Sequence, residues 1–477
     1  MDNEKHIKKR AFLPVRAFKC WLKGDLFVKL TPLLWGVGYI RRRKYVKGFL
    51  ALLFEFAVIV FTAFFSMPNI SKLGTLGTVR REVVYNSATL KNEVNDYDNS
   101  FLILLFGLVG LIVILMSVII LLKIVTESQE LQEKSERNEK INSFREDYRE
   151  LFNEKFHITL MAAPTLGIIV FTIIPLIFMI LVAFTNLDRN HMSPTELFTW
   201  VGLDNFIRLF SDSLSDTFGY SFLKVLGWTL TWAFFATFTC YFGGIFVSLL
   251  INHKRTRLKK LWRTLFVICI AVPQFVSLLL VRNFFADTGI VNTFLANIGV
   301  TDLLKTVGLL EDHFTYIPFL TQAGWAKVMI ILINFWIGVP YLMLIATGVL
   351  MNIPSDFYEC AKIDGAGPFK MFTKITMPFM LAVTAPYLVT AFVANINNFN
   401  VIYLLTQDVF VTADTKLAAS NAKDIDLLVT WLFRLTNEFY NYKMAAVIGI
   451  LVFVVCAVFT LLAFNYTFKI IKEDKFQ

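Results

Sequence analysis

Long apolar runs, separated by short polar segments, dominate the chain from residue 49 to residue 466. A helix of about 18 apolar residues or more can cross a hydrocarbon core of roughly 30 Å, so runs of that length are candidate spans. Such runs lie near 49–66, 101–123, 160–184, 223–250, 264–285, 326–350, 379–404 and 443–466. The pattern predicts an all-α, polytopic protein with about eight transmembrane helices in a lipid bilayer.

The N-terminal region, residues 1–48, is polar and basic around one shorter apolar stretch. The stretch from Leu26 to Ile40 is interrupted by Lys29 and Pro32, so we expect an interfacial or re-entrant segment, with a partial span as the alternative. The first 26 residues lack a short apolar region followed by a small-residue cleavage site, and we therefore expect no removable signal peptide.

The charged residues indicate an orientation. Only 17% of the residues are charged and 56% are hydrophobic, whereas soluble domains are about 25% charged. The net charge of +10 comes from the N-terminal tail and from alternate loops: residues 254–263 carry six Lys or Arg, whereas Lys305 is the only one in residues 286–325. Cytoplasmic loops of membrane proteins are rich in Lys and Arg. We therefore expect both termini in the cytoplasm and no nucleic-acid partner.

A charged segment follows the first two spans, which occupy residues 49–123. Residues 124–159 include the run from Glu127 to Lys155, rich in Glu, Lys, Arg and Gln, which predicts a charged helix on the cytoplasmic surface. A solvated helical linker is the preferred interpretation, and a partner-binding element is the alternative. At the other end, residues 467–477 form a cytoplasmic tail.

The motifs of the common catalytic and metal sites are missing. The sequence contains no GxxxxGK[ST], HExxH or GxSxG, and its five histidines are isolated from one another. None of the five cysteines lies in a segment expected outside, and no CxxC pair occurs, so we expect no disulfide and no zinc. The sequence therefore predicts no catalytic residue and no metal site. If ATP drives this protein, another polypeptide must bind the ATP and its magnesium ion.

Few charged residues fall inside the expected spans. Glu55 lies in the first span and Arg282 near the outer end of the fifth, whereas proton- or sodium-coupled carriers concentrate such groups near the midplane. For Glu55, polarity in helix packing is favoured over an ion role. A secondary carrier or a channel remains the main alternative function, and a membrane scaffold or sensor is a third.

The segment 353–378, between the sixth and seventh runs, predicts two short helices. The first opens near Ser355, with Asp356 favourable at the positive helix end, and stops at Gly365, where a left-handed residue is allowed. A second short helix starts at Pro368. Together they would form a compact knob on the cytoplasmic face.

This segment resembles the EAA loop of the membrane subunits of ABC importers. The residues that match the pattern at its spacing are Glu359, Ala361, Gly365, Ile375 and Pro378, while Cys360 and Met377 replace an Ala and a Leu. The resemblance implies that the knob is a coupling helix that docks into a cleft on a dimeric cytoplasmic ATPase. Glu359 would make polar contacts there, Gly365 would permit the turn, and Asp364 belongs to the same coupling set.

Residues 160–466 resemble most the MalF-type subunits of maltose and maltodextrin importers. The strings that carry this likeness are Val201 to Phe206, Val272 to Ser277 and Asp426 to Val429. The resemblance implies a six-helix type I importer core, a second membrane subunit, an extracellular sugar-binding protein and no cofactor in this chain. The N-terminal part looks like versions from Gram-positive bacteria, which implies the bacterial plasma membrane. One departure is that only residues 186–222 stand where the enterobacterial form has a large outer domain.

Two sets of polar residues are spaced to share helix faces. In the sixth run Asn334, Gly338 and Tyr341 fall at i, i+4 and i+7, and in the seventh Ala391, Asn395 and Asn398 do the same. Amides suit sugar hydroxyls, an aromatic ring suits the apolar face of a sugar ring, and Gly338 would admit a ligand to the backbone.

The resemblance to MalF-type subunits implies a sugar-binding role for part of this set. It implies that Asn334, Ile337, Gly338, Tyr341, Asn395 and Asn398 line a sugar site, and that Ala391 and Ala394 depart from it. Interhelical packing is the alternative, and it is favoured for Asn397 and Asn400. Pro340 and Pro386 are expected to interrupt the two helices beside a cavity.

Overall fold

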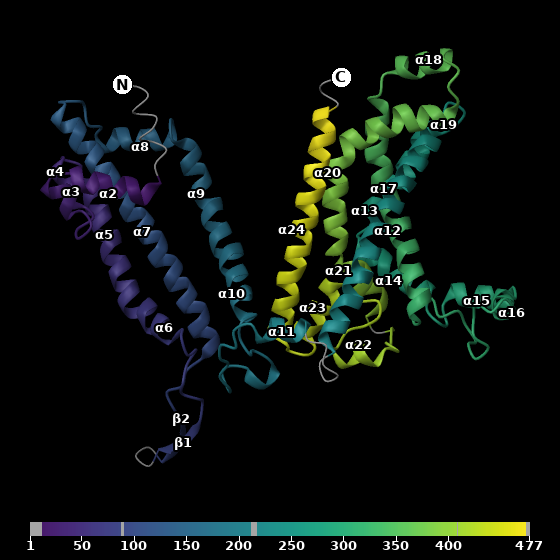
Figure 1. Ribbon diagram of the computed structural model, residues 1–477, viewed down its shortest axis with the longest axis horizontal. Coiled ribbons are helices and arrows are strands. Elements are labelled where there is room, and N and C mark those ends of the chain that lie inside the picture. The colour runs from purple at the N-terminus through teal and green to yellow at the C-terminus, as the bar shows by residue number, and fades with distance from the viewer. Residues whose placement is uncertain (1–11, 87–89, 211–216, 408, 474–477) are drawn as a thin grey trace. The chain divides into compact units, whose positions relative to one another are not determined.

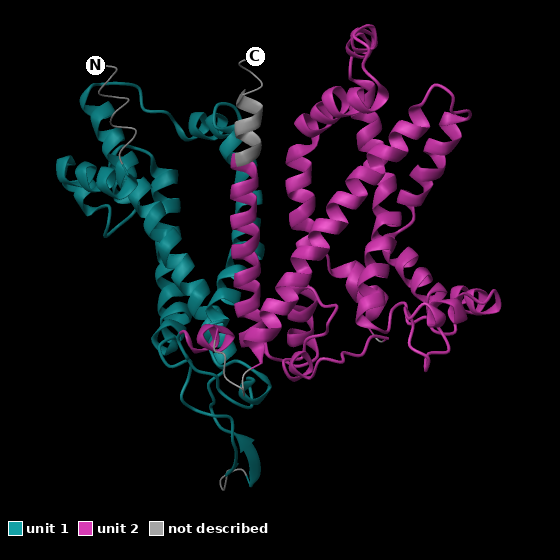
Figure 2. Cartoon of the chain, turned by 45° about the vertical axis from the view of Figure 1, so that its right-hand side comes forward, with its two compact units in different colours: residues 1–202 teal, residues 203–477 magenta. Residues whose placement is uncertain are grey.

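The computed structural model describes residues 12–86, 90–210, 217–407 and 409–473. The chain divides into two compact units, residues 1–202 and 203–477 (Figure 2). Seven helices in the described residues are long and apolar enough to cross a membrane, and a bent helix pair raises the number to eight. The predicted all-α membrane fold with about eight spans is therefore confirmed.

The described part of unit 1 contains three helices long and apolar enough to span a membrane, and several short ones (Figure 1). The short helices α2 (Leu13–Lys23), α3 (Leu26–Leu30) and α4 (Val37–Arg41) precede α5 (Tyr45–Phe61), η1 (Thr62–Ser66) and α6 (Met67–Lys72). An antiparallel hairpin of β1 (Val83–Asn86) and β2 (Lys91–Val94) leads to α7 (Ser100–Glu136). There follow α8 (Phe144–Phe152), α9 (Phe156–Ile168), η2 (Ile169–Ile173), α10 (Ile174–Val182) and η3 (Arg189–His191).

Unit 2 begins with α11 (Asp204–Phe210) and the long helix α12 (Phe218–Asn252). Next come α13 (Lys259–Ala271), α14 (Gln274–Phe284), α15 (Ile290–Asn297), α16 (Val300–Thr306), α17 (Ala323–Met351) and α18 (Ser355–Ile363). The remaining elements are α19 (Pro368–Met371), η4 (Phe372–Thr376), α20 (Met377–Ile396), α21 (Phe399–Thr406), α22 (Thr415–Ala419), α23 (Leu428–Asn437) and α24 (Tyr442–Glu473).

In the described residues, three helices contain a π turn, and each turn stands directly before a methionine–proline or isoleucine–proline pair. The turns η1, η2 and η4 precede Pro68, Pro175 and Pro378. Proline has no N–H to donate and its ring crowds the preceding turn, so a regular α-helix kinks or breaks there. A widened turn accommodates the proline, and the helix continues past it.

The fifth apolar run does not form one straight span. Helices α13 and α14 meet at 92°, separated by Val272 and Pro273. The residue before a proline avoids the helical region, and Val272 has an extended ψ of 126°. The prediction of a single helix over 264–285 was therefore wrong, because Pro273 breaks it.

The charged segment after the second span also differs from the prediction. Helix α7 continues to Glu136, residues 137–143 are not helical, and α8 starts anew with a capping box between Ser143 and Glu146. The expected single helix from Glu127 to Lys155 is thus two helical pieces. A strong N-cap inside the segment favours a new helix start over continuation.

The stretch from Leu26 to Ile40 forms two short helices, α3 and α4, joined by turns, rather than one span. Glu55, in the first span, is buried and its Oε2 accepts a hydrogen bond from the Trp35 backbone N–H at 2.9 Å. This contact gives the Glu55 side chain a structural partner within unit 1.

The core of unit 2 forms where α12 packs along α17 and α20. Gly243 and Gly244 of α12 allow this close approach, because a Cβ at either position would lie within 3 Å of Phe335 or Leu342 of α17. Trp232 and Tyr241 of α12 are buried side chains of this core. The packing of these three helices positions the cavity described next.

Candidate functional site

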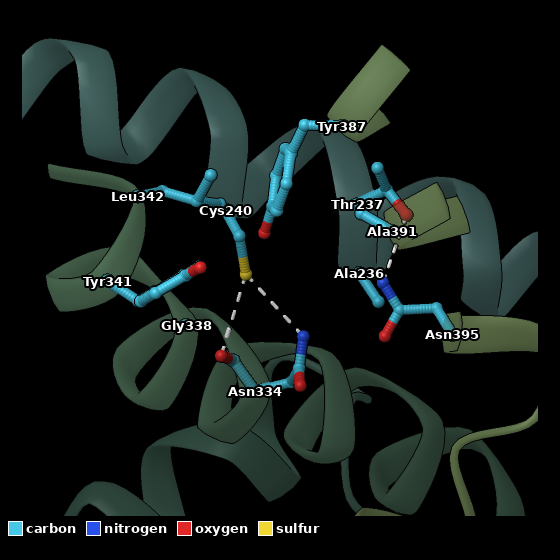
Figure 3. Close-up of a pocket in the computed structure, with 10 residues that line it drawn as sticks. All are labelled: Ala236, Thr237, Cys240, Asn334, Gly338, Tyr341, Leu342, Tyr387, Ala391 and Asn395. Atoms are coloured by element: carbon cyan, nitrogen blue, oxygen red, sulfur yellow. Dashed lines mark hydrogen bonds between the residues drawn. The ribbon is translucent and has the colours of Figure 1, made fainter. Parts of the chain in front are cut away.

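A cavity of about 160 Å³ opens between α12, α17 and α20 (Figure 3). It is lined by Ala236, Thr237, Cys240, Asn334, Gly338, Tyr341, Leu342, Tyr387, Ala391 and Asn395. Three amide or hydroxyl side chains and two phenol rings therefore meet in the middle of otherwise apolar helices. This is the residue chemistry that a hydroxyl-rich ligand with apolar ring faces requires.

The face predicted on α17 exists. Asn334, Gly338 and Tyr341 all line the cavity, and Asn334 is 7% exposed. The Asn334 Nδ2 donates to Cys240 Sγ at 3.5 Å, and that thiol donates to the Asn334 carbonyl oxygen at 3.6 Å. These hydrogen bonds to Cys240 fix the amide at the cavity wall (Figure 3).

Helix packing requires a glycine at position 338, in addition to the place of Gly338 at the cavity. A Cβ on Gly338 would stand 2.6 Å from the Cys240 Sγ, which is closer than side chains approach in proteins. The glycine is therefore needed for α17 to lie against α12, independently of any ligand.

The two phenol rings come from different helices. Tyr341 of α17 and Tyr387 of α20 lie with ring centroids 6.2 Å apart, and the Tyr341 side chain is half exposed. Sequence analysis identified Tyr341 and missed Tyr387. Tyr387 lies one turn before Ala391, so the periodicity used for the seventh run, extended by four residues, would have found it.

Asn395 is held by hydrogen bonds on α20. Its Nδ2 donates to Thr237 Oγ1 at 3.0 Å, and its Oδ1 accepts from Asn398 Nδ2 at 3.3 Å. Its backbone carbonyl accepts from the indole N–H of Trp232 at 3.0 Å. The Asn395 side chain is thereby oriented at the cavity (Figure 3).

Asn398 does not share the helix face predicted for it. Helix α20 ends at Ile396, and Asn398 caps α21, where its Oδ1 accepts from the Val401 N–H at 3.3 Å. Asn is a preferred N-cap residue, so a chain break at this point uses the side chain for capping. Asn398 is absent from the cavity wall and contacts it only through Asn395.

Ile337 lines a second cavity rather than the first. That cavity is about 270 Å³ and lies at the break between α13 and α14. Its lining includes Gln274, Ser277, Trp336, Ile337 and Tyr341, so Tyr341 borders both cavities. Gln274, Ser277 and Trp336 were missed, although Pro273 within an apolar run was a signal that the span is broken there.

Pro340 and Pro386 do not interrupt their helices. Each lies inside a continuous helix, α17 or α20. Asn397, for which packing was favoured, donates through Nδ2 to the Val393 carbonyl at 3.1 Å and to Cys456 Sγ of α24 at 3.6 Å. That contact joins two spans, as the packing interpretation expects.

The knob between α17 and α20 has the predicted first helix. Helix α18 starts at Ser355, and Pro354, rather than Ser355, stands at the cap position. Gly365 has a φ of +74°, and the Ala366 N–H donates to the Ala361 carbonyl at 2.8 Å, which closes the helix end. The left-handed turn that the sequence placed at Gly365 is thus present.

The second helix of the knob is not a separate short helix. Helix α19 begins at Pro368 as predicted but runs through η4 directly into α20. Tyr358 of α18 and Thr376 of η4 share a hydroxyl–hydroxyl hydrogen bond of 2.9 Å, which ties α18 back to this helix. Glu359, Asp364 and Pro378 are exposed, and Ala361 and Ile375 are half-buried.

Comparison with known proteins decides the family. A family model described as binding-protein-dependent transport system inner membrane component matches residues 241–472. The galactooligosaccharides transport system permease protein of Bacillus subtilis is 32% identical over 447 residues, which cover 93% of this chain and 98% of that protein. The chain belongs to this permease family.

Further relatives agree with this family. The maltodextrin transport system permease protein of Streptococcus pneumoniae is 30% identical over 448 residues, covering 93% of this permease and 96% of that protein. A solved bacterial alginate ABC transporter, in complex with an alginate pentasaccharide-bound periplasmic protein, has a chain with a TM-score of 0.52 and 23% identity. That match covers 68% of this permease and 98% of the solved chain, and it concerns the fold alone.

Family membership assigns the permease to the membrane-spanning part of an ABC importer, which is a transport component and not a catalytic subunit. A secondary carrier, a channel without an ATPase and a scaffold are thereby set aside. The matched residues 241–472 include the knob and the two cavity walls on α17 and α20.

Proposed function

We propose that this permease translocates an oligosaccharide of the maltodextrin type, delivered by an extracellular binding protein, through a pathway that includes the cavity between α12, α17 and α20. The relatives transport galactooligosaccharides and maltodextrin by their names. The observation that carries the proposal is the gathering of Asn334, Tyr341, Tyr387 and Asn395 at one cavity inside apolar helices. Hydrogen-bonding amides and aromatic rings together bind sugars, whereas packing polarity alone needs no rings.

The cavity volume supports a second membrane subunit. Pockets that enclose a small molecule measure about 300–1,000 Å³. The cavity of about 160 Å³ is smaller than this range and open. It therefore forms one wall of a larger chamber, and a second permease subunit supplies the opposite wall.

The knob is proposed to dock on a dimeric cytoplasmic ATPase that binds ATP and magnesium. Glu359 and Asp364 present exposed carboxylates, and Ile363 and Phe369 present side chains that are 86% and 79% exposed. Exposed large apolar side chains beside charges are typical of a protein interface. This arrangement supports contact with a partner rather than with water.

The location that follows is the plasma membrane of a bacterium, Gram-positive by the likeness of the N-terminal part, with both termini in the cytoplasm. The six Lys and Arg residues of 254–263, in the loop after α12 and the first turns of α13, support this sidedness.

Sugar uptake by the assembled importer tests the cavity. We expect Asn395→Ala and Tyr341→Ala each to reduce maltodextrin-dependent uptake at least severalfold, because each removes a hydrogen-bonding or stacking group from the wall. Asn397→Ala is the matched control, since Asn397 contacts α24 instead of the cavity. Full uptake in the two cavity variants, with normal assembly, would return these residues to a packing role.

A further inference from the structure

Helix α2 lies near one end of unit 1 (Figure 1), and exposed apolar side chains form a stripe along it. Its members Phe12, Val15, Phe18 and Leu22 are 75%, 48%, 59% and 53% exposed. Their spacing of three or four residues puts them on one side of the helix. Ala17, on the opposite side, is 1% exposed, and Arg16 forms an ion pair with Glu130 of α7. The helix therefore packs on α7 with one face and leaves an apolar face outside.

Helix α8 is also amphipathic, with its acidic side turned toward the protein and its apolar side exposed. Its acidic side faces basic residues of unit 1: Asp147 accepts from Lys44 Nζ at 2.5 Å, and Glu150 pairs with Lys155 Nζ at 2.7 Å. The hydrogen bond from Lys155 lowers the pKa of Glu150 below its usual range, so this side stays charged at neutral pH.

The opposite side of α8 is apolar and outward. Phe144, Tyr148, Leu151 and Phe152 are 51%, 56%, 42% and 50% exposed. The ring of Tyr148 lies 6.5 Å from that of Phe144 and 5.0 Å from that of Phe152, which makes a continuous aromatic face. A helix facing water would turn its acidic side outward instead, so this face indicates an apolar medium.

The aromatic face of α8 continues into a membrane span. Only residues 153–155 separate α8 from Phe156, the first residue of α9. In the most apolar part of the span that starts there, only 6% of the residues are buried. Phe156 and Ile158 at its start are 48% and 55% exposed. The surface of α8 is thus continuous in the chain with the surface on which α9 enters lipid.

Helix α2 packs on α7 just beyond the apolar part of that helix. Besides the Arg16–Glu130 pair, the Asp25 N–H at its C-terminal end donates to Gln132 Oε1 of α7 at 2.8 Å. Lys123 is the first charged residue of α7 after its apolar part, and Glu130 lies about 10 Å beyond it at 1.5 Å per residue. A bilayer adds a headgroup layer of several Å to each side of its hydrocarbon core.

The surroundings of the two apolar faces are basic. The exposed cations on the two helices are Lys19 and Lys23 of α2, which contains no Asp or Glu, and Arg145 and Arg149 of α8, whose three acidic residues are less exposed. Apolar side chains flanked by Lys and Arg are typical of helices that lie in a membrane surface containing anionic lipids.

We propose that α2 and α8 form an interfacial collar that binds an anionic phospholipid leaflet, with their apolar faces at the acyl-chain boundary and their Lys and Arg residues on the phosphate groups. The collar fixes the end of the α5, α7 and α9 spans in the plane of the membrane. It does not depend on the nature of the transported molecule.

Spin labels on the full-length permease in lipid nanodiscs test the proposal. The five native cysteines are replaced by serine, and a nitroxide is attached at Leu151→Cys on the apolar side of α8 or at Arg149→Cys as the matched control on its polar side. We expect the label at position 151 to be relaxed strongly by oxygen and weakly by a water-soluble nickel complex, and the label at 149 to show the reverse, a severalfold difference in the ratio. Val15→Cys and the native Cys20, retained as the single cysteine, repeat the comparison on α2, because position 20 lies about 140° around the helix from position 15, on the side of Arg16 and Glu130. A failure of one variant to fold then leaves the other pair.

Each other outcome overturns the collar. Equal access of the nickel complex to 149 and 151 would mean that the face is in water. Exclusion of both reagents from 151 would mean that a protein, such as a second copy or another subunit, covers it.

The anionic preference is tested in the same samples. With phosphatidylglycerol added to phosphatidylcholine, we expect the oxygen-to-nickel ratio at position 15 to rise, and Lys19→Gln with Lys23→Gln to remove the rise. An oxygen-to-nickel ratio that does not change when phosphatidylglycerol is added would overturn the assignment of the phosphate groups as the ligand.

Discussion

At the scale of single residues, helix packing and the proposed sugar site depend on the same positions. Gly338 borders the cavity, yet its lack of a side chain is already required by Cys240 of α12. Asn395 likewise borders the cavity while its amide bonds Thr237 and Asn398. Sequence spacing therefore found residues of α17 that line the cavity, without distinguishing a packing role from a binding role.

Gly338→Ala should destabilise the permease. Its Cβ would overlap Cys240 Sγ, and overpacking of this kind costs about 1–3 kcal/mol. Gly348→Ala on the same helix meets no atom within 4 Å and should be neutral or stabilise by up to about 1 kcal/mol through helix propensity. Thermal unfolding in detergent measures both, and equal midpoints for the two variants would contradict this packing account.

Asp414 should make the loop before α23 sensitive to acid. Hydrogen bonds from Lys224 Nζ at 2.6 Å and Tyr220 OH at 2.8 Å, with backbone N–H groups of Lys416 and Leu417, hold the Asp414 pKa below its usual range. A carboxylate whose pKa is lower in the folded state stabilises the folded protein. This stabilisation is fully present above the unfolded pKa of about 3.9 and is lost as the pH falls through the folded pKa.

Thermal unfolding as a function of pH checks this sign. We expect Asp414→Asn to lower the midpoint at neutral pH and to differ less from the parent as the pH falls below about 4. Asp302→Asn, at an exposed acid of α16, is the control. A loss that grows toward acid pH would show that the carboxylate is not the stabilising form.

At the scale of elements, the sequence predicted the spans well because length and apolarity decide membrane insertion. It failed where local chemistry interrupts a run: Pro273 breaks the fifth span, Asn398 starts a new helix, and Ser143 caps α8. At Pro378 the sequence predicted separate helices, whereas the structure has one helix that continues past the proline through a π turn. A proline in an apolar run therefore indicates a special backbone without specifying whether it breaks or widens the helix.

The turn of the knob depends on one glycine. Gly365 has a φ of +74°, where a residue with a side chain is strained by roughly 1–2 kcal/mol, whereas Gly367 has a φ of −72°. We expect Gly365→Ala to increase hydrogen exchange over residues 360–368 and to weaken coupling of ATP hydrolysis to uptake. Gly367→Ala should change neither, and identical exchange in both variants would refute the role of the left-handed turn.

At the scale of the whole molecule, the order of the spans and the distribution of Lys and Arg predict a sidedness that can be measured. Cys360 is exposed on α18, in the knob expected to face the cytoplasm. With the other four cysteines replaced, an impermeant maleimide should label Cys360 in inside-out vesicles and spare it in intact cells.

The control uses a loop expected on the other side. Asp302→Cys, in a background with no native cysteine, should be labelled from outside intact cells, since α16 belongs to the loop that is poor in Lys and Arg. Labelling of Cys360 from the outside would invert the topology and separate the knob from any cytoplasmic ATPase.

The continuous helix from Pro368 to Ile396 has a mechanical consequence. Figure 1 draws α19 and α20 as one ribbon that bends, and Tyr358 fastens α18 to it through Thr376. No flexible joint intervenes between the surface element and Tyr387 or Asn395. The bent helix can therefore act as a lever: a push on α19 would move the cavity residues of α20, because the π turn accommodates Pro378 without interrupting the run of helical residues between them.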